Sequence, residues 1–162
     1  MLKIAVQKSG RLYDESLTLL KSCGLYVDNG MDQLKAEVRG FPAEVYFLRN
    51  SDIPQYLEDG VVDIAIIGEN VLYEQKVGVE VLVKLGFSKC RLSMAVPQHS
   101  GYEDVRFFEG KRIATSYPNT VKSFLKANGV NAEIHQISGS VEIAPHIGLA
   151  DGICDLVSSG NT

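Results

Sequence analysis

Residues 154–162 read Cys-Asp-Leu-Val-Ser-Ser-Gly-Asn-Thr: an apolar run carries an acid and then breaks into small polar residues. In an α/β fold, a buried strand delivers such a carboxylate and such a loop to the carboxyl edge of a sheet. Because Gly160 lacks a Cβ, successive backbone N–H groups can turn toward a phosphate, and the neighbouring hydroxyls add donors. Asp155 can accept two O–H hydrogen bonds, which suits the vicinal hydroxyls of a ribose 5-phosphate. The alternative is an ordinary strand and turn.

The composition excludes several functional classes. The 162 residues are 45% hydrophobic and 22% charged, with a formal net charge of -4 and a pI near 5.4, so no nucleic-acid-binding surface is expected. No apolar run reaches the ~18 residues of a membrane span, and Met1-Leu2-Lys3 leads into a strand-like segment without a signal-peptide pattern. We therefore expect a cytoplasmic protein without membrane contact. The three cysteines and three histidines lack the spacing of a disulfide framework or a metal site.

Apolar β-rich runs alternate with helical periodicity along the chain, which is typical of a mostly parallel sheet covered by helices. A polar patch with Pro97, Ser100 and Gly101 separates two such cycles. We therefore predict an α/β fold of two lobes, residues 1–96 and 97–162, with an intervening cleft that suits a small ligand. The predicted strands are residues 2–6, 43–48, 62–67, 79–85, 91–96, 112–115, 132–136 and 153–157, and the predicted helices are residues 12–23, 52–58, 70–75, 120–128 and a segment from about 141.

Polar loops of a kind that binds phosphate follow several of these strands. Gln7-Lys8-Ser9-Gly10-Arg11 combines a glycine with two cations of different geometry. Other strands are followed by Gly68-Glu69-Asn70, by Thr115-Ser116-Tyr117 and by Ser138-Gly139-Ser140, which opens the segment that carries Glu142. Each loop by itself is explained by ordinary helix capping. Together with residues 158–162 they gather at strand carboxyl ends, the edge at which open α/β sheets bind ligands.

Several catalytic motifs are missing from the sequence. It contains no Gly-x-x-x-x-Gly-Lys-Ser/Thr loop, no Gly-x-Gly-x-x-Gly dinucleotide turn, no Gly-x-Ser-x-Gly nucleophile elbow and no Cys-x-x-Cys. A phosphate-rich site without a built-in nucleophile indicates group transfer between bound phosphorylated substrates. In that chemistry the protein supplies position and charge.

Blocks along the whole chain together resemble the ATP phosphoribosyltransferase family, the first enzyme of histidine biosynthesis. They occur in the family's order: QKSGR at 7–11, LRNSDIP at 48–54, DGVVD at 59–63, IGEN at 67–70, KRIATSYP at 111–118, GSVEIAP at 139–145, and GLAD at 148–151 running on to Thr162. The resemblance implies a two-lobed fold like the type II periplasmic binding proteins. It also implies a 5-phosphoribosyl diphosphate loop at Asp155 to Thr162, ATP held across the cleft, and a Mg2+ requirement.

The implied reaction joins N1 of the adenine of ATP to C1 of the phosphoribosyl group and releases pyrophosphate, forming N1-(5-phosphoribosyl)-ATP. A ring nitrogen already carries a lone pair, so no nucleophilic triad is needed. Lys8 and Arg11 are the first candidates for stabilising the departing pyrophosphate together with Mg2+, and Arg49 is the third.

By the same resemblance, Glu142 and Asp155 hold ribose hydroxyls, while Asp151 either contributes to the site or has a structural capping role. The 5-phosphate is held by Ser158, Ser159, Gly160, Asn161 and Thr162. The other expected substrate-binding residues come from the loops described above: Gln7, Ser9, Gly10, Gly68, Glu69, Asn70, Thr115, Ser116 and Tyr117. No metal ligand is assigned to the protein.

Full family members continue past Thr162, so we expect a truncated catalytic region whose first lobe lacks its returning segment and which is catalytically weak by itself. The longer family form ends in a histidine-binding regulatory domain, and the shorter form uses a separate regulatory protein. The loop at residues 7–11 looks more like the longer form. The full-length protein is expected to be a homo-oligomer. Two other functions stay open: a non-catalytic two-lobed binding module for a phosphorylated ligand, and a phosphoribosyltransferase with a different base acceptor.

Overall fold

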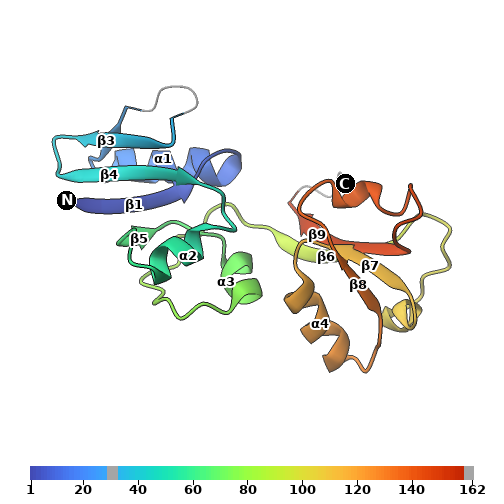
Figure 1. The fold of residues 1–162 in the computed structure, drawn as a ribbon. Coiled ribbons are helices and arrows are strands. Elements are labelled where there is room, and N and C mark those ends of the chain that lie inside the picture. The colour runs from blue at the N-terminus through green and yellow to red at the C-terminus, as the bar shows by residue number, and fades with distance from the viewer. Residues whose placement is uncertain (29–32, 159–162) are drawn as a thin grey trace. The chain divides into compact units, whose positions relative to one another are not determined.

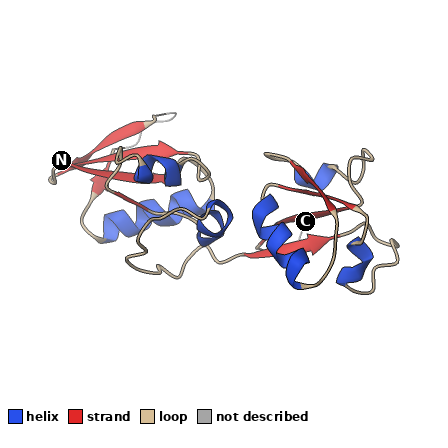
Figure 2. Ribbon diagram, turned by 60° about the horizontal axis from the view of Figure 1, so that its bottom comes forward, coloured by secondary structure: helices blue, strands red, loops and turns tan. Residues whose placement is uncertain are grey.

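The computed structural model describes residues 1–28 and 33–158. It divides into two compact units, unit 1 (Met1–Ser88) and unit 2 (Lys89–Thr162). Each unit is an α/β assembly in which helices pack on a sheet (Figure 1, Figure 2). The predicted two-lobed α/β class is confirmed. The division falls after Ser88 rather than after residue 96, because the strand Arg91–Ala95 pairs within unit 2.

Unit 1 has a mixed sheet with strand order β2-β3-β4-β1-β5. Strand β1 runs parallel to β4 and β5, while β3 is antiparallel to β2 and β4. In chain order its elements are β1 (Leu2–Gln7), α1 (Arg11–Ser22), β2 (Tyr26–Val27), β3 (Lys35–Arg39), β4 (Ala43–Leu48), α2 (Ile53–Glu58), β5 (Ile64–Ala65) and α3 (Glu69–Gln75).

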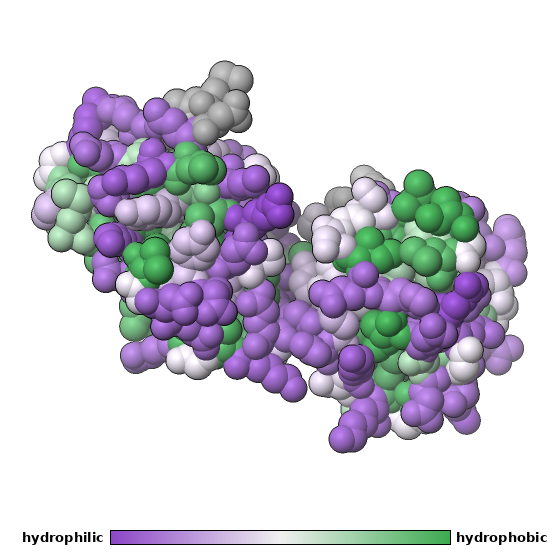
Figure 3. All heavy atoms as spheres, viewed as in Figure 1, coloured by the Kyte–Doolittle hydropathy of each residue, from purple (hydrophilic) through white to green (hydrophobic). Residues whose placement is uncertain are grey.

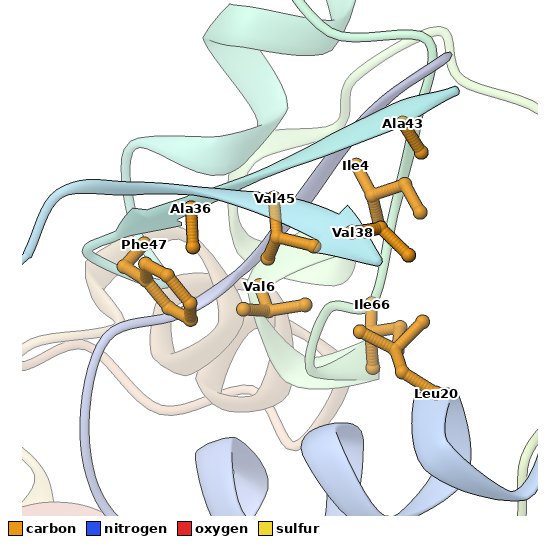
Figure 4. Close-up of a cluster of buried hydrophobic side chains, with 9 residues drawn as sticks. All are labelled: Ile4, Val6, Leu20, Ala36, Val38, Ala43, Val45, Phe47 and Ile66. Carbon is orange, nitrogen blue, oxygen red and sulfur yellow. The ribbon is translucent and has the colours of Figure 1, made fainter. Parts of the chain in front are cut away.

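The core of unit 1 follows from the alternation within its strands. Buried and half-buried positions alternate along β4, so Val45 and Phe47 lie in one cluster with Ile4 and Val6 of β1 and with the last turn of α1 (Figure 4). The other face of the sheet packs against α2, whose Ile53 is fully buried. Because β1 is covered on both faces, the loop that follows it starts from a fixed point of the core.

Residues 79–85 form no strand, and the prediction of a strand there was wrong. They have the β-branched composition of a strand, but the sheet described for unit 1 ends at β5 and no described strand forms a ladder with them. Val81, Leu82 and Val83 are left 57%, 73% and 68% exposed. Apolar patches interrupt the largely polar surface seen in Figure 3. Strand propensity without a pairing partner does not make a strand.

Two further elements are shorter than predicted. The apolar run at residues 62–67 contributes only Ile64–Ala65 to the sheet, paired with Ile4 and Ala5. The segment from residue 141 is a 3-10 turn, η2 (Val141–Ile143), instead of an α-helix. Pro145 has no backbone N–H with which to continue an α-helical ladder there.

Unit 2 has a sheet with strand order β6-β9-β7-β8. Strand β7 is parallel to β8 and β9, and β6 is antiparallel to β9. Its elements are β6 (Arg91–Ala95), the 3-10 turn η1 (Val105–Phe108), β7 (Arg112–Thr115), α4 (Pro118–Ala127), β8 (Glu133–Gln136), η2, and β9 (Gly152–Val157). One cluster packs α4 and η1 on the sheet and a second packs the η2 segment on it. None of the described helices is both long and apolar enough to cross a membrane.

The two units share one topology at their centres. In unit 1 the first strand, β1, lies between β4 and β5, and in unit 2 the first parallel strand, β7, lies between β8 and β9. The chain therefore leaves the central strand toward one side and returns on the other, which creates a switch point at the carboxyl ends of the strands. Open α/β sheets bind ligands at such points. The loops after β1 and β5, and those after β7 and β9, are thus the candidate sites.

Candidate functional site

The loop after β1 leads directly into α1. Gly10 precedes the helix with φ 84°, a left-handed conformation that favours glycine, and no side chain caps the helix N-terminus. The amide Nε2 of Gln7 donates to the carbonyl of Ser9 at 2.8 Å, which holds the turn from inside. The first N–H groups of a 12-residue helix and its partial positive charge are therefore available at this loop.

Three cationic side chains follow the carboxyl ends of strands in unit 1: Lys8 and Arg11 after β1, and Arg49 after β4. Lys8 and Arg49 are exposed and form no ion pair with the described residues. The backbone N–H of Lys8 donates to the carbonyl of Leu48 at 2.9 Å, so these two cations follow neighbouring strands. Arg11 lies 3.8 Å from Glu15 one turn along α1, and both side chains are well exposed. An exposed ion pair of this kind contributes little to stability.

Gly68 ends the loop after β5, and Glu69 and Asn70 are the first two residues of α3. Glu69 is paired with Lys84 at 3.0 Å, and this hydrogen bond raises the pKa of the Lys84 ammonium. The N–H of Gly68 donates to Oδ1 of Asn50 at 3.4 Å. Asn50 was not singled out from the sequence, because its partner is 18 residues away along the chain. The sequence signal that could have pointed to Asn50 as a site residue was its position just after the strand Ala43–Leu48, in the block 48–54.

The loop after β7 uses its hydroxyls for structure. Thr115 is fully buried, donates from Oγ1 to the carbonyl of Cys154 at 2.8 Å and accepts from the N–H of Tyr117 at 3.0 Å. Ser116 donates to the carbonyl of Ile137 at 2.5 Å. These bonds fix the turn into α4, which begins at Pro118 without a side-chain cap. Ligand contact by Thr115 and Ser116 stays a prediction, and their hydroxyls are already engaged.

Asp155 lies where the sequence placed it. Its neighbour Cys154 pairs with Thr115, the last residue of β7, so Asp155 stands just past the end of that strand. It is half-buried and accepts through Oδ1 from the N–H of Leu156 at 2.8 Å. Ser158 follows and is exposed. The predicted phosphate-binding residues Ser159, Gly160, Asn161 and Thr162 lie outside the described residues.

Glu142 is exposed on η2, in the other segment predicted to hold ribose hydroxyls. Ser140 precedes it with φ 49°, so the turn enters η2 from a left-handed residue. The carboxylate of Glu142 forms no ion pair with the described residues. It is free to accept hydroxyl donors.

Asp151 lies at the opposite edge of the unit 2 sheet. It precedes β9, and its carboxylate accepts from the backbone N–H of Arg112, the first residue of β7, at 2.9 Å and from the Arg112 guanidinium at 3.4 Å. These bonds lower the pKa of the Asp151 carboxyl. Of the two roles left open by the sequence, the structural one fits: Asp151 ties the amino ends of two strands and lies away from the carboxyl-edge loops.

Cations, amides, hydroxyls and carboxylates thus lie at the switch points of two mixed sheets. The fold and these loops define a two-unit α/β protein whose candidate sites lie at the carboxyl edges of its strands.

Comparison with known proteins gives the family. Residues 49–162 match the sequence model of ATP phosphoribosyltransferase, HisG. Over all 162 residues the chain is 55% identical to the ATP phosphoribosyltransferase of Parabacteroides distasonis and 53% identical to that of Cytophaga hutchinsonii. Among solved structures, the ATP phosphoribosyl transferase (HisG:HisZ) complex from Thermotoga maritima matches 99% of this chain and 76% of that chain, with a TM-score of 0.80 and 32% identity.

The chain belongs to the ATP phosphoribosyltransferase family. It covers 57% of each of the two curated relatives, and so spans a little over half of their length. The resemblance read from the sequence blocks is confirmed.

Proposed function

We propose that the protein transfers the 5-phosphoribosyl group of 5-phosphoribosyl diphosphate to N1 of the adenine of ATP, the first step of histidine biosynthesis. It is then a glycosyltransferase that releases pyrophosphate and forms N1-(5-phosphoribosyl)-ATP. The observation that carries this proposal is the 55% identity to an ATP phosphoribosyltransferase along the entire chain. Exposed cations at the unit 1 edge, and carboxylates at the unit 2 edge without ion pairs to described residues, support it.

The reaction requires the protein mainly to align the two substrates and to stabilise the negative charge on the leaving pyrophosphate. The lone pair of adenine N1 forms the new bond to C1 of the ribose, the bond from C1 to the diphosphate oxygen breaks, and its electron pair leaves with pyrophosphate. No base has to remove a proton from N1, which carries none, so the lack of a nucleophilic triad is consistent with the reaction. Lys8 and Arg11, with Arg49 as a third, are proposed to stabilise the charge on the departing pyrophosphate.

The proposed ligand contacts divide by chemistry. Asp155 and Glu142 accept from ribose hydroxyls, and the loop from Ser158 to Thr162 holds the 5-phosphate. The loop at residues 7–11 contacts the departing pyrophosphate, the segment 68–70 contacts the phosphates of ATP, and the backbone of residues 115–117 contacts the phosphoribosyl substrate. This division matches the acceptors and donors found at each edge.

A Mg2+ ion fits this site as a companion of the diphosphate. No group of three or more His, Cys, Asp or Glu side chains in the described part of the chain could hold a metal by itself. Mg2+ commonly binds through one or two carboxylates plus substrate phosphates and waters. Asp155, whose Oδ2 accepts nothing from the described residues, is the carboxylate that would hold it. When bound, the ion would neutralise charge on the diphosphate.

We further propose a homo-oligomeric full-length protein that acts in the cytoplasm. Both substrates are multiply charged phosphate esters, which do not cross a membrane unaided. The solved relative from Thermotoga maritima is a HisG:HisZ complex. Whether this protein takes such a partner or carries its own regulatory domain is answered by the oligomeric composition of the purified full-length protein.

The test is incubation of the full-length protein with ATP, 5-phosphoribosyl diphosphate and Mg2+, followed by chromatography and mass spectrometry. We expect N1-(5-phosphoribosyl)-ATP and an equal amount of pyrophosphate. Binding of both substrates without product would indicate the binding module instead. Pyrophosphate release with another base and none with ATP would indicate a different acceptor.

A further inference from the structure

Two asparagine side chains from separate loops meet at Gly68. Asn50, in the loop between β4 and α2, accepts from the N–H of Gly68 at 3.4 Å. Asn70, in the first turn of α3, fills the space where a side chain of Gly68 would start: a Cβ there would lie 2.5 Å from Oδ1 of Asn70 and 3.1 Å from Nδ2 of Asn50. The carboxamides of Asn50 and Asn70 therefore both lie next to the backbone of Gly68.

The amide nitrogen of Asn70 is left without a partner. Its Nδ2 is shielded from solvent and forms no hydrogen bond with the described residues. Buried donors in folded proteins are almost always bonded, so an unbonded one calls for an explanation.

An unbonded amide can move at low cost. Because Nδ2 has no hydrogen bond to the described residues, rotation of the Asn70 side chain breaks no hydrogen bond of that nitrogen. The surface it would reach is the switch point between β1 and β5, where ligands of open α/β sheets bind. The acid next to it, Glu69, is already paired with Lys84. The amide N–H groups of Asn70 would bind an anionic oxygen acceptor at this place.

We propose that Asn70 rotates outward to donate from Nδ2 to a phosphate oxygen of ATP, and that Asn50 is the positioning residue that holds the Gly68 turn during this movement. The inference rests on the proposed function, since it takes ATP as the ligand of unit 1. Asn70 contacts substrate, whereas Asn50 acts only through Gly68 and Asn70. Because Gly68 has no side chain, the carboxamide of Asn70 can lie against it when no ligand is bound.

Direct binding of ATP to the full-length protein, measured by calorimetry, tests the contact without depending on turnover. Asn70→Ala and Asn70→Asp both remove the donor, and each is expected to raise the Kd for ATP about tenfold, the effect of one hydrogen bond to a charged group. The Kd for 5-phosphoribosyl diphosphate is expected to stay unchanged. Unaltered ATP affinity in both variants would overturn the proposal.

Asn50 is tested by kinetics and by a double-mutant cycle. Asn50→Ala is expected to raise the KM for ATP severalfold with little change in kcat, and to add nothing in the Asn70→Ala protein. The neighbouring Ser51→Ala, which removes only a 3.3 Å contact to Asp52, is the matched control. Equal losses from Asn50→Ala in both backgrounds would show that Asn50 does not act through Asn70.

Gly68→Ala provides an independent check. It is expected to change the Kd for ATP clearly in the protein that keeps Asn70 and less in the Asn70→Ala protein, where the contact at 2.5 Å is gone and only that with Nδ2 of Asn50 at 3.1 Å remains; equal changes in both backgrounds would count against the proposal. Gly78→Ala, where a new Cβ meets nothing within 4 Å, should change neither. A full-length protein that binds ATP as described but forms no N1-(5-phosphoribosyl)-ATP would refute the proposed function and leave this inference standing.

Discussion

The carboxyl edges of the two units are built from opposite chemistry. At the unit 1 edge, Lys8 and Arg49 are exposed without ion pairs to described residues, and the amide of Asn70 is unbonded. At the unit 2 edge, the hydroxyls of Thr115 and Ser116 are consumed by internal hydrogen bonds, while the Asp155 carboxylate keeps free acceptor capacity. Unit 1 thus exposes donors and unit 2 exposes acceptors, and the proposed contacts assign the donors to phosphates and the acceptors to sugar hydroxyls.

The difference shows that a shared topology fixes where a site lies and leaves its chemistry to the loops. Both units have a central strand with parallel neighbours on its two sides. Each switch point is therefore placed by packing of the core, and the residues just past the strand ends are free to specialise. The following experiments test this division of labour.

The largest effect is expected for Arg11→Ala. If Arg11 acts mainly on the departing pyrophosphate, turnover should fall by roughly 10² to 10³-fold, as for loss of one charge-stabilising donor, while ATP binding weakens much less. Arg11→Lys should restore activity only in part, because an ammonium lacks the bidentate fork. Steady-state kinetics with Lys21→Ala, on the same helix, as control would measure it. Unchanged turnover with a raised KM for ATP would mean that Arg11 binds only the ground state.

The next effect tests the acceptors of unit 2. Asp155→Ala is expected to weaken binding of 5-phosphoribosyl diphosphate by ~1.5 to 3 kcal/mol, the range for hydrogen bonds that involve a charged group, and to leave the fold intact. Calorimetric titration measures it. Asp151→Ala, in the same sheet at the opposite edge, should leave this affinity unchanged. The same affinity in Asp155→Ala and wild type would remove Asp155 from the site.

Thr115→Val asks whether the hydroxyls of unit 2 are structural. The change keeps the shape of the side chain but strips the Cys154 carbonyl and the Tyr117 N–H of their partner in a fully buried place. A loss of ~1 to 3 kcal/mol in the free energy of unfolding is expected, without a matching loss of ligand affinity in the folded protein. Urea unfolding checks it. Thr18→Val, which removes an exposed hydroxyl bonded to Asp14, should cost under ~0.5 kcal/mol.

The smallest effect concerns pH. The Arg112 backbone N–H and guanidinium lower the pKa of Asp151 below its ordinary value of 3.8. The ionised form is therefore favoured by folding, and this stability is present above pH 3.8 and disappears as the pH falls through the lowered pKa. Both side chains are more than one-third exposed, so the contribution is at most ~1 kcal/mol.

Urea unfolding of wild type and Asp151→Asn at neutral pH and in acid measures this contribution. The gap between the two proteins should be present at neutral pH and narrow in acid. Asp59→Asn, which changes an exposed aspartate bonded to the neutral amide of Gln55, is the control. A gap that stays constant down to acid pH would contradict an ionic role for Asp151.

Local sequence predicted much of the fold because its signals are local. Helix α4 (Pro118–Ala127) lies within two residues of the predicted helix 120–128 at each end, and β4 has the predicted bounds Ala43–Leu48. Gly10 takes the left-handed conformation before α1, in the loop predicted to bind phosphate. The predicted segment 79–85 failed for the complementary reason: a strand needs a neighbour, and its own residues do not report whether one is present.

By itself, then, the sequence determined the α/β class, most of the strands and helices, the family, and the loops that follow the central strands. These depend on periodicity and on residues close together in the chain. Tertiary structure decided which polar groups in those loops are free. Asp151 and Arg112 are 39 residues apart, as are Thr115 and Cys154, and Gly68 and Asn50 are 18 apart. A hydrogen bond already made within the fold removes a group from ligand binding, and only the folded chain shows which bonds are made.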